Sequence, residues 1–196
     1  DMNNLSYSVG KPILYMAGDA NGWATNDYLA GEDGVKFTGY MYLNQNGFKF
    51  CTQPEWKGTN YGADFNTAPD AANITITEPA GYYKVDVDLS AKTYTLYPIT
   101  SISMIGDATP GGWDADTDLT YNATERCWEI KDVHLEAKEL KFRSNHSWDD
   151  PNPNWGGTPD ALVQKGGNIK VAEDGKYDVK LYAWANGYAK CELIKK

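Results

Sequence analysis

The chain has 196 residues and a net charge of −9, from 18 basic and 27 acidic side chains, so a basic surface for nucleic acid or anionic membranes is not expected. No apolar run reaches the 18 residues that a membrane-spanning helix needs. Trp and Tyr (7 and 14) outnumber Phe (5), which favours half-exposed aromatic surfaces, because these rings combine an apolar face with a polar edge.

The predicted elements are short β-strands along the whole chain. Alternation of apolar and polar residues over 83–89, 93–97, 127–133 and 177–184 predicts strands with one buried face. Gly, Pro, Asn and Asp separate such runs, and no stretch keeps a helical period over ten residues. The three cysteines lack C-x-x-C spacing and are expected as small buried side chains. Strand number and spacing predict an all-β protein of immunoglobulin-like β-sandwiches.

The sequence repeats itself once. LYMAGDANGW at 14–23 is matched by SMIGDATPGGW at 103–113, and FKFCTQPEW at 48–56 is matched by LKFRSNHSW at 140–148. Further matched blocks follow in the same order, so we predict two homologous β-sandwich domains, 1–98 and 99–196. The connector between them, around residues 97–100, is short and lacks Gly/Ser character, which predicts a fixed relation between the domains.

The repeated loops combine aromatic rings with planar hydrogen-bonding groups. Sugar rings have an apolar C–H face and a rim of hydroxyls, so this combination predicts carbohydrate binding. Trp rings that fold back to cap the sandwich are the structural alternative. The residues concerned are Trp23, Trp56, Asn60 and Tyr61 in the first copy, and Trp113, Arg143, Asn145, Trp148, Asn154 and Trp155 in the second.

The order of the motifs GDA…GW, LKFRSNHSW…NWGG, GGNI and DGKYDVKLY resembles the SusE/SusF family of starch-utilisation surface lipoproteins of Bacteroidetes over essentially the whole chain. The resemblance implies non-catalytic domains without a cofactor, which bind starch or another α-glucan through an aromatic arc, a Lys or Arg, and an Asn. It also implies a lipid-anchored location outside the outer membrane, where other surface proteins of the uptake system could be partners. The chain would then be the carboxy-terminal pair of domains, which accounts for a start at Asp1 without a signal peptide or anchor cysteine.

Transferred residue by residue, the family pattern fits the second copy better and makes it the expected main site. Cys51 stands where the second copy has Arg143, so a weaker first site is expected, with Lys49 or Lys57 in place of the arginine. The residues expected to bind ligand in the second copy are Trp113, Arg143, Trp155, Asn168, Lys165, Asn145 and Trp148. Those expected in the first copy are Trp23, Trp56, Tyr61, Asn73 and Lys57.

Other functions are considered and not favoured. Catalysis is not predicted, because the catalytic motifs H-E-x-x-H and G-x-S-x-G are missing from the sequence. Asp114, Asp116 and Asp118 have the opening spacing of a calcium loop, but Leu119 stands where the turn needs glycine, so a solvated turn before a strand is expected. A protein-interaction or adhesion module and a different neutral glycan remain as alternatives.

Overall fold

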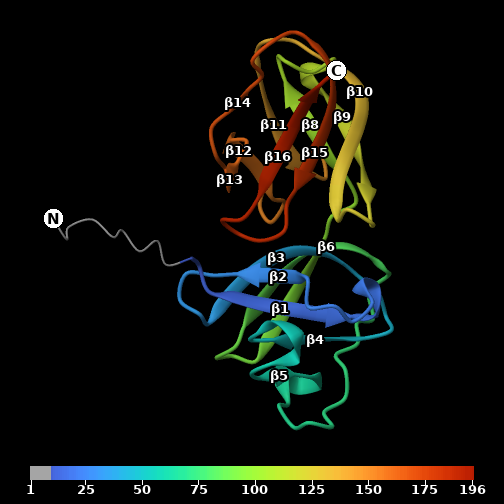
Figure 1. Cartoon of the computed structure of the whole chain (residues 1–196), viewed down its shortest axis with the longest axis vertical. Helices are drawn as coiled ribbons and strands as arrows, with labels where there is room; N and C mark the ends of the chain where they lie inside the picture. The colour runs from blue at the N-terminus through green and yellow to red at the C-terminus, as the bar shows by residue number, and fades with distance from the viewer. Residues whose placement is uncertain (1–9) are drawn as a thin grey trace, which may run out of the picture.

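A computed structural model describes residues 10–196 as two antiparallel β-sheets, one in each half of the chain (Figure 1). The first has seven strands: β1 (Ile13–Gly18), β2 (Asp27–Ala30), β3 (Lys36–Leu43), β4 (Phe48–Cys51), β5 (Asn60–Tyr61), β6 (Gly81–Asp88) and β7 (Thr93–Pro98). The second has nine: β8 (Ile102–Gly106), β9 (Gly112–Asn122), β10 (Cys127–Leu135), β11 (Glu139–Ser144), β12 (Asn154–Thr158), β13 (Ala161–Gln164), β14 (Ile169–Lys170), β15 (Gly175–Tyr182) and β16 (Lys190–Lys195). The predicted all-β class is confirmed, as two β-sandwich domains.

Among the described residues, 10–196, helical structure is limited to three short 3-10 turns in the loops of the first domain. These are η1 (Asp19–Asn21), η2 (Pro54–Trp56) and η3 (Ala63–Phe65). Within residues 10–196, no helix is long and apolar enough to cross a membrane.

The two sheets have the same strand order. The first runs β5-β4-β1-β2-β3-β6-β7, and the second runs β12-β11-β8-β9-β10-β15-β16, with β13 added beside β12 and β14 beside β11. The internal repeat is therefore visible in topology as well as in sequence. Cys51 pairs with Asn60 in the first domain and Arg143 pairs with Asn154 in the second, so the strand register defines which residues of the two copies are equivalent.

Each domain has its own core, built by the alternation of side chains along its strands. In β6, Val85 and Val87 are buried, while Asp86 and Asp88 lie on the opposite, partly exposed face. In the second domain, β9 joins the two layers of the sandwich, because residues 117–119 pair with β8 and residues 120–122 pair with β10.

The cysteines are part of these cores. Cys51, Cys127 and Cys191 are buried and free, as predicted. Burial raises the pKa of the Cys51 and Cys127 thiols to about 11, so both remain protonated and poorly nucleophilic near neutral pH.

The two domains meet at a packed interface. Ile99 of the connector is buried, and the Tyr40 N–H donates to the Trp184 carbonyl at 2.8 Å. An ion pair between Arg126 and Asp27, with an N–O distance of 2.9 Å, also crosses the interface. These contacts hold the domains in one relative orientation.

Candidate functional site

Two tryptophans of the first domain lie side by side at its surface. Trp23 follows η1 and Trp56 is the last residue of η2. Their ring centroids are 6.2 Å apart and their planes are inclined by 32°. Trp56 is 38% exposed and Trp23 is half-buried, so the two inclined rings form an aromatic surface that is partly open to solvent.

Backbone contacts hold the two loops that carry these rings. The Trp23 N–H donates to the Gly18 carbonyl at 2.8 Å, and the Glu55 N–H donates to the Thr25 hydroxyl at 2.8 Å. Trp23 and Trp56 have φ values of 63° and 62°, in the left-handed region that bulky residues seldom adopt. Such conformations persist where the surrounding structure imposes them, and they are typical of ligand-binding sites.

A polar pocket of about 450 Å³ adjoins Trp56, and Lys49, Thr59 and Asn60 contribute to its lining. The Lys49 side-chain ammonium lines this pocket and forms no ion pair or hydrogen bond with a residue in the range 10–196. The Asn60 amide donates to the Trp56 carbonyl at 3.2 Å, but its Oδ1 is buried and has no partner in the described part of the chain. An unpaired buried acceptor costs about 1–3 kcal/mol, which a ligand hydroxyl or an ordered water that reached it would offset.

Two other residues predicted for the first copy do not extend the aromatic surface. Tyr61 is half-buried and packs against Phe65 in the core, with 6.0 Å between ring centroids. Lys57 is exposed and forms an ion pair with Glu55 at 2.6 Å. Tyr61 therefore packs against the core and is not part of the exposed aromatic surface. The charge of Lys57 is neutralised by Glu55.

Asn73 and Asn168 occupy equivalent, exposed positions in the two domains. Asn73 precedes Ile74, which pairs with Phe48, the residue before Lys49. Asn168 precedes Ile169, which pairs with Leu140, the residue before Lys141. The Asn168 amide donates to Glu139 at 2.9 Å, so that amide already has a partner. Asn73 remains a candidate ligand residue beside Lys49.

Trp155 does not form the predicted aromatic arc, and this prediction is wrong. Its side chain is 1% exposed, and its ring packs edge-on against Tyr40 of the first domain at a centroid distance of 5.2 Å. The strand register explains the burial. Trp155 pairs with Phe142, a core residue, and directly opposed residues of an antiparallel pair share one face of the sheet.

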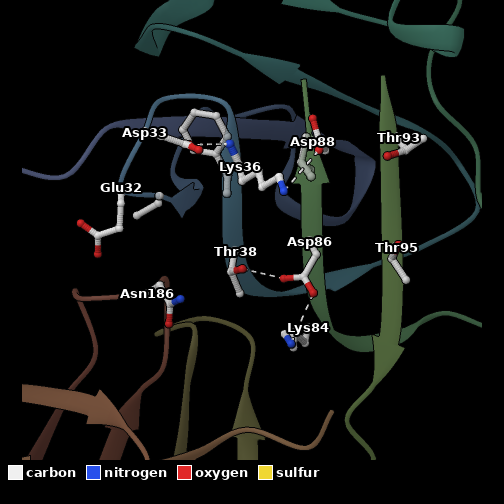
Figure 2. Close-up of a pocket in the computed structure, with 14 residues that line it drawn as sticks. Glu32, Asp33, Lys36, Thr38, Lys84, Asp86, Asp88, Thr93, Thr95 and Asn186 are labelled. Carbon is white, nitrogen blue, oxygen red and sulfur yellow. Dashed lines mark hydrogen bonds and ion pairs between the residues drawn. The ribbon is translucent and has the colours of Figure 1, made fainter. Parts of the chain in front are cut away.

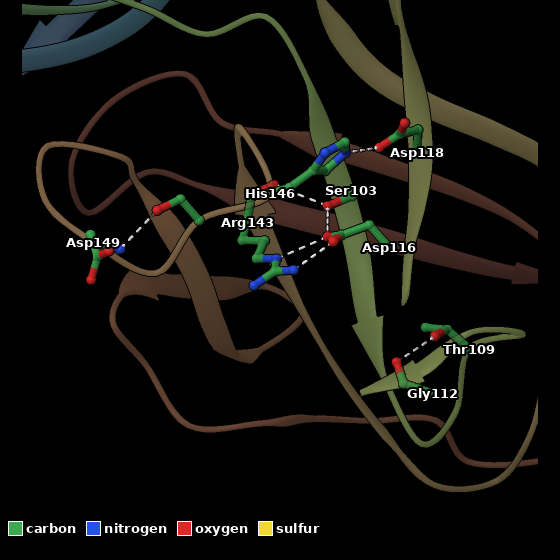
Figure 3. Close-up of polar contacts among 9 residues, drawn as sticks. Ser103, Thr109, Gly112, Asp116, Asp118, Arg143, His146 and Asp149 are labelled. Carbon is green, nitrogen blue, oxygen red and sulfur yellow. Dashed lines mark hydrogen bonds and ion pairs between the residues drawn. The ribbon is translucent and has the colours of Figure 1, made fainter. Parts of the chain in front are cut away.

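Arg143 is also not the free hydroxyl donor that the sequence suggested (Figure 3). Its guanidinium donates from Nε to Asp116 Oδ1 at 2.9 Å and from Nη2 to Asp116 Oδ2, and the Ser103 hydroxyl donates to the same carboxylate. The Trp148 ring lies 4.9 Å from the guanidinium carbon, and the Arg143 side chain is 13% exposed. This arginine is therefore mainly engaged in binding Asp116.

The exposed rings of the second domain are separate. Trp113 and Trp148 are 41% and 40% exposed, but they form no ring pair with each other in the described structure. The Lys141 ammonium lies 5.1 Å from the Trp148 ring centre and donates to Asn154 Oδ1 at 3.1 Å. Burial lowers the pKa of Lys141. The second domain thus has two separate exposed tryptophan rings, whereas the first domain has a pair of adjacent rings.

Asn145 and Lys165 have other polar partners in the structure. The Asn145 amide donates to the Pro98 carbonyl at 3.0 Å, and its Oδ1 accepts from the Thr100 N–H at 2.8 Å, so this residue anchors the connector. Lys165 forms an ion pair with Asp150 at 3.0 Å. The prediction that Asn145 binds ligand is corrected accordingly.

The calcium-like spacing lies on the strand β9 rather than in a turn. Asp116 is bound to Arg143, and Asp118 Oδ1 lies 2.6 Å from His146 Nε2. On an extended strand these carboxylates are not arranged around a common centre.

The Arg143–Asp116 pair predicts that part of the stability of the second domain is sensitive to acid. The hydrogen bond from Arg143 holds the pKa of Asp116 below its usual value of 3.8. The stabilisation is therefore complete above about pH 4 and is lost as the pH falls through the lower, folded-state pKa. Urea unfolding at a series of acidic pH values should show a shallower pH dependence for Asp116→Asn. An identical pH dependence in the variant and the parent would contradict this prediction.

A larger polar cavity, of about 600 Å³, lies on the outer face of β3, β6 and β7 (Figure 2). Thr38 donates to Asp86 at 2.5 Å, and Lys84 forms an ion pair with the same carboxylate at 3.3 Å. Lys36 lies 4.0 Å from Asp88. These charged groups are paired with one another, and the aromatic residue of the lining, Phe37, is buried, so the cavity lacks the exposed ring pair that Trp23 and Trp56 provide.

Comparison with known proteins assigns no family to the chain. The sequence matches no protein-family model, and no curated protein is significantly similar to it. The interpretation of the site therefore depends on its geometry and on the motifs in the sequence.

Proposed function

We propose that this chain binds a polysaccharide without chemically altering it, and that the paired Trp23 and Trp56 rings are its main contact surface. The observation that carries the proposal is this ring pair, 6.2 Å apart and inclined by 32°, beside a pocket that contains Lys49 and Asn60. The rings would cover the C–H faces of sugar units, while the ammonium and the amide would bind hydroxyls. The favoured site is thus in the first domain, whereas the sequence alone favoured the second.

The inclination of the two rings favours a curved ligand. An α-linked glucan bends along its length, so the faces of successive sugar units turn, while a flat β-linked chain would stack best on coplanar rings. Starch or a related α-glucan is therefore the favoured ligand, in agreement with the resemblance to the SusE/SusF family. A lipid-anchored position at the cell surface and contact with other proteins of an uptake system belong to the same proposal.

Affinity electrophoresis through gels that contain starch, pullulan, dextran, xyloglucan or levan tests the proposal. We expect retardation by starch and pullulan, strong loss of retardation in Trp56→Ala, and unchanged retardation in Trp148→Ala, an exposed tryptophan outside the pair. Retardation only by another polymer would refute the α-glucan assignment. Equal migration in all gels would refute glycan binding.

A protein-interaction or adhesion role is the second candidate. The observation that favours it is the exposure of Trp113 and Trp148, since unpaired surface tryptophans also serve protein interfaces. It becomes the preferred function if no polymer retards the chain.

A further inference from the structure

An aromatic pocket at the domain junction lies apart from the proposed glycan site. Its volume is about 580 Å³, and its walls come from both domains and from the connector. The residues that define it chemically are Tyr42, Glu78, Tyr82, Pro98, Tyr121 and Trp128. None of them takes part in the Trp23–Trp56 surface, so this pocket is separate from the proposed glycan site.

Five aromatic residues line the pocket, Tyr42, Tyr82, Tyr83, Tyr121 and Trp128, and four of their rings contact one another at different angles. Tyr42 and Tyr121 are nearly parallel, with an angle of 6° and a centroid distance of 6.2 Å across the domain interface. Tyr82 is inclined by 53° to Tyr121 and by 87° to Trp128, at 4.9 and 5.3 Å. The pocket therefore offers ring faces and edges in several orientations, of which the Tyr42 ring is the most exposed.

The charged residues in and around the pocket favour a positively charged ligand. Its lining includes Glu78 and no lysine, arginine or histidine. The Glu78 carboxylate accepts a hydrogen bond from the Thr77 N–H at 3.1 Å and forms no ion pair within residues 10–196. Arg126 lines an adjoining pocket, but Asp27 neutralises it at 2.9 Å. The chain as a whole carries a net charge of −9, which adds to the negative potential.

The phenol groups in the wall stay neutral at physiological pH. Burial raises the pKa of both Tyr82 and Tyr121. A neutral ring keeps the negative electrostatic potential over its face that attracts cations. The Glu78 carboxylate is then the one formal charge in the lining, and it has the sign that a cation requires.

We propose that this interdomain pocket binds a compact organic cation of the quaternary ammonium class. Aromatic walls attract such a cation through the ring faces, tolerate its apolar surface, and do not require the hydrogen bonds that a sugar needs. Because the walls belong to both domains, the bound cation would also strengthen the interface and raise the thermal stability of the chain.

Isothermal titration calorimetry with choline, compared with its uncharged isostere 3,3-dimethyl-1-butanol at constant ionic strength, tests the proposal. We expect saturable choline binding that is at least about tenfold tighter than binding of the isostere, because only choline interacts electrostatically with the rings and Glu78. Equal affinity for the two compounds would show a merely apolar pocket. Undetectable choline binding would also overturn the proposal.

Variants locate the site. Tyr42→Ala should weaken choline binding at least about tenfold. Tyr42→Phe, which keeps the ring, should bind choline with nearly the affinity of the parent chain. Glu78→Gln at the exposed rim should weaken binding about threefold without disturbing the fold. Choline binding that both Tyr42→Ala and Glu78→Gln leave unchanged would overturn the proposal. Retardation in starch gels should persist in Tyr42→Ala, so failure of this inference and failure of the glycan proposal are distinguishable.

Discussion

Replacing Trp155 by alanine is expected to lower the free energy of unfolding by about 3–5 kcal/mol. The Trp155 side chain is 1% exposed in the second core, and its ring also packs against Tyr40 of the first domain. The substitution therefore leaves a large cavity and removes a contact that joins the two domains. Urea denaturation followed by far-UV circular dichroism measures the change.

The matched controls are the exposed tryptophans of the same domain. Trp113→Ala and Trp148→Ala remove rings of the same size that are 41% and 40% exposed. Trp113→Ala should cost less than about 1 kcal/mol, and Trp148→Ala, whose ring also contacts Arg143 and Lys141, less than about 2 kcal/mol. If Trp155→Ala were as mild as these controls, the ring could not lie in the core, and Trp155 would again be a candidate for the ligand surface.

Replacing Trp56 by alanine is expected to weaken binding of soluble α-glucan by at least about 30-fold, or about 2 kcal/mol. The variant removes one of the two rings of the proposed surface. Because Trp56 is 38% exposed, the fold should tolerate the change. Calorimetric titration with maltoheptaose measures the affinity, and thermal unfolding of the variant verifies that it is folded.

Trp148→Ala is the control for this prediction, because it truncates an equally exposed tryptophan at the equivalent loop of the second domain. It should bind maltoheptaose with nearly the affinity of the parent chain. A larger loss from Trp148→Ala than from Trp56→Ala would move the main glycan site to the second domain.

The fold class could be predicted from the sequence because its signals are local. The alternation of buried and exposed residues in β6 and β15 has the period of a strand, and turn residues separate the runs. The repeated motifs also matched the correct strands. Tyr61 and Trp155 occupy equivalent positions, since they pair with Phe50 and Phe142 respectively.

The arrangement of the site depends on contacts between distant residues, which the sequence does not reveal. Equivalence of Tyr61 and Trp155 did not indicate that both rings point inward. Arg143 could not be assigned to Asp116, 27 residues away. Trp23 and Trp56 come together because the two loops share the hydrogen bond from Glu55 to Thr25, 30 residues apart.

One local signal for the site was present. Lys49 and Lys141 occupy the same place in the repeated segments FKF and LKF. In each domain the residue two positions after this lysine, Cys51 or Arg143, pairs with an asparagine of the neighbouring strand. The repeated lysine, more than the arginine found in one copy, indicates the polar group that the two domains share. The two lysines differ in their side-chain partners, since the Lys141 ammonium donates to Asn154 while the Lys49 ammonium has no partner among residues 10–196.

The most direct test of the proposed glycan site is a titration of nitrogen-15-labelled protein with maltoheptaose, observed at the indole N–H signals of its seven tryptophans. Substitution of single tryptophans assigns the signals. We expect the signals of Trp23 and Trp56 to shift most and to saturate together, while that of buried Trp155 stays in place. Largest shifts at Trp113 and Trp148, with Trp23 and Trp56 unchanged, or no shift at any tryptophan, would contradict the proposed site.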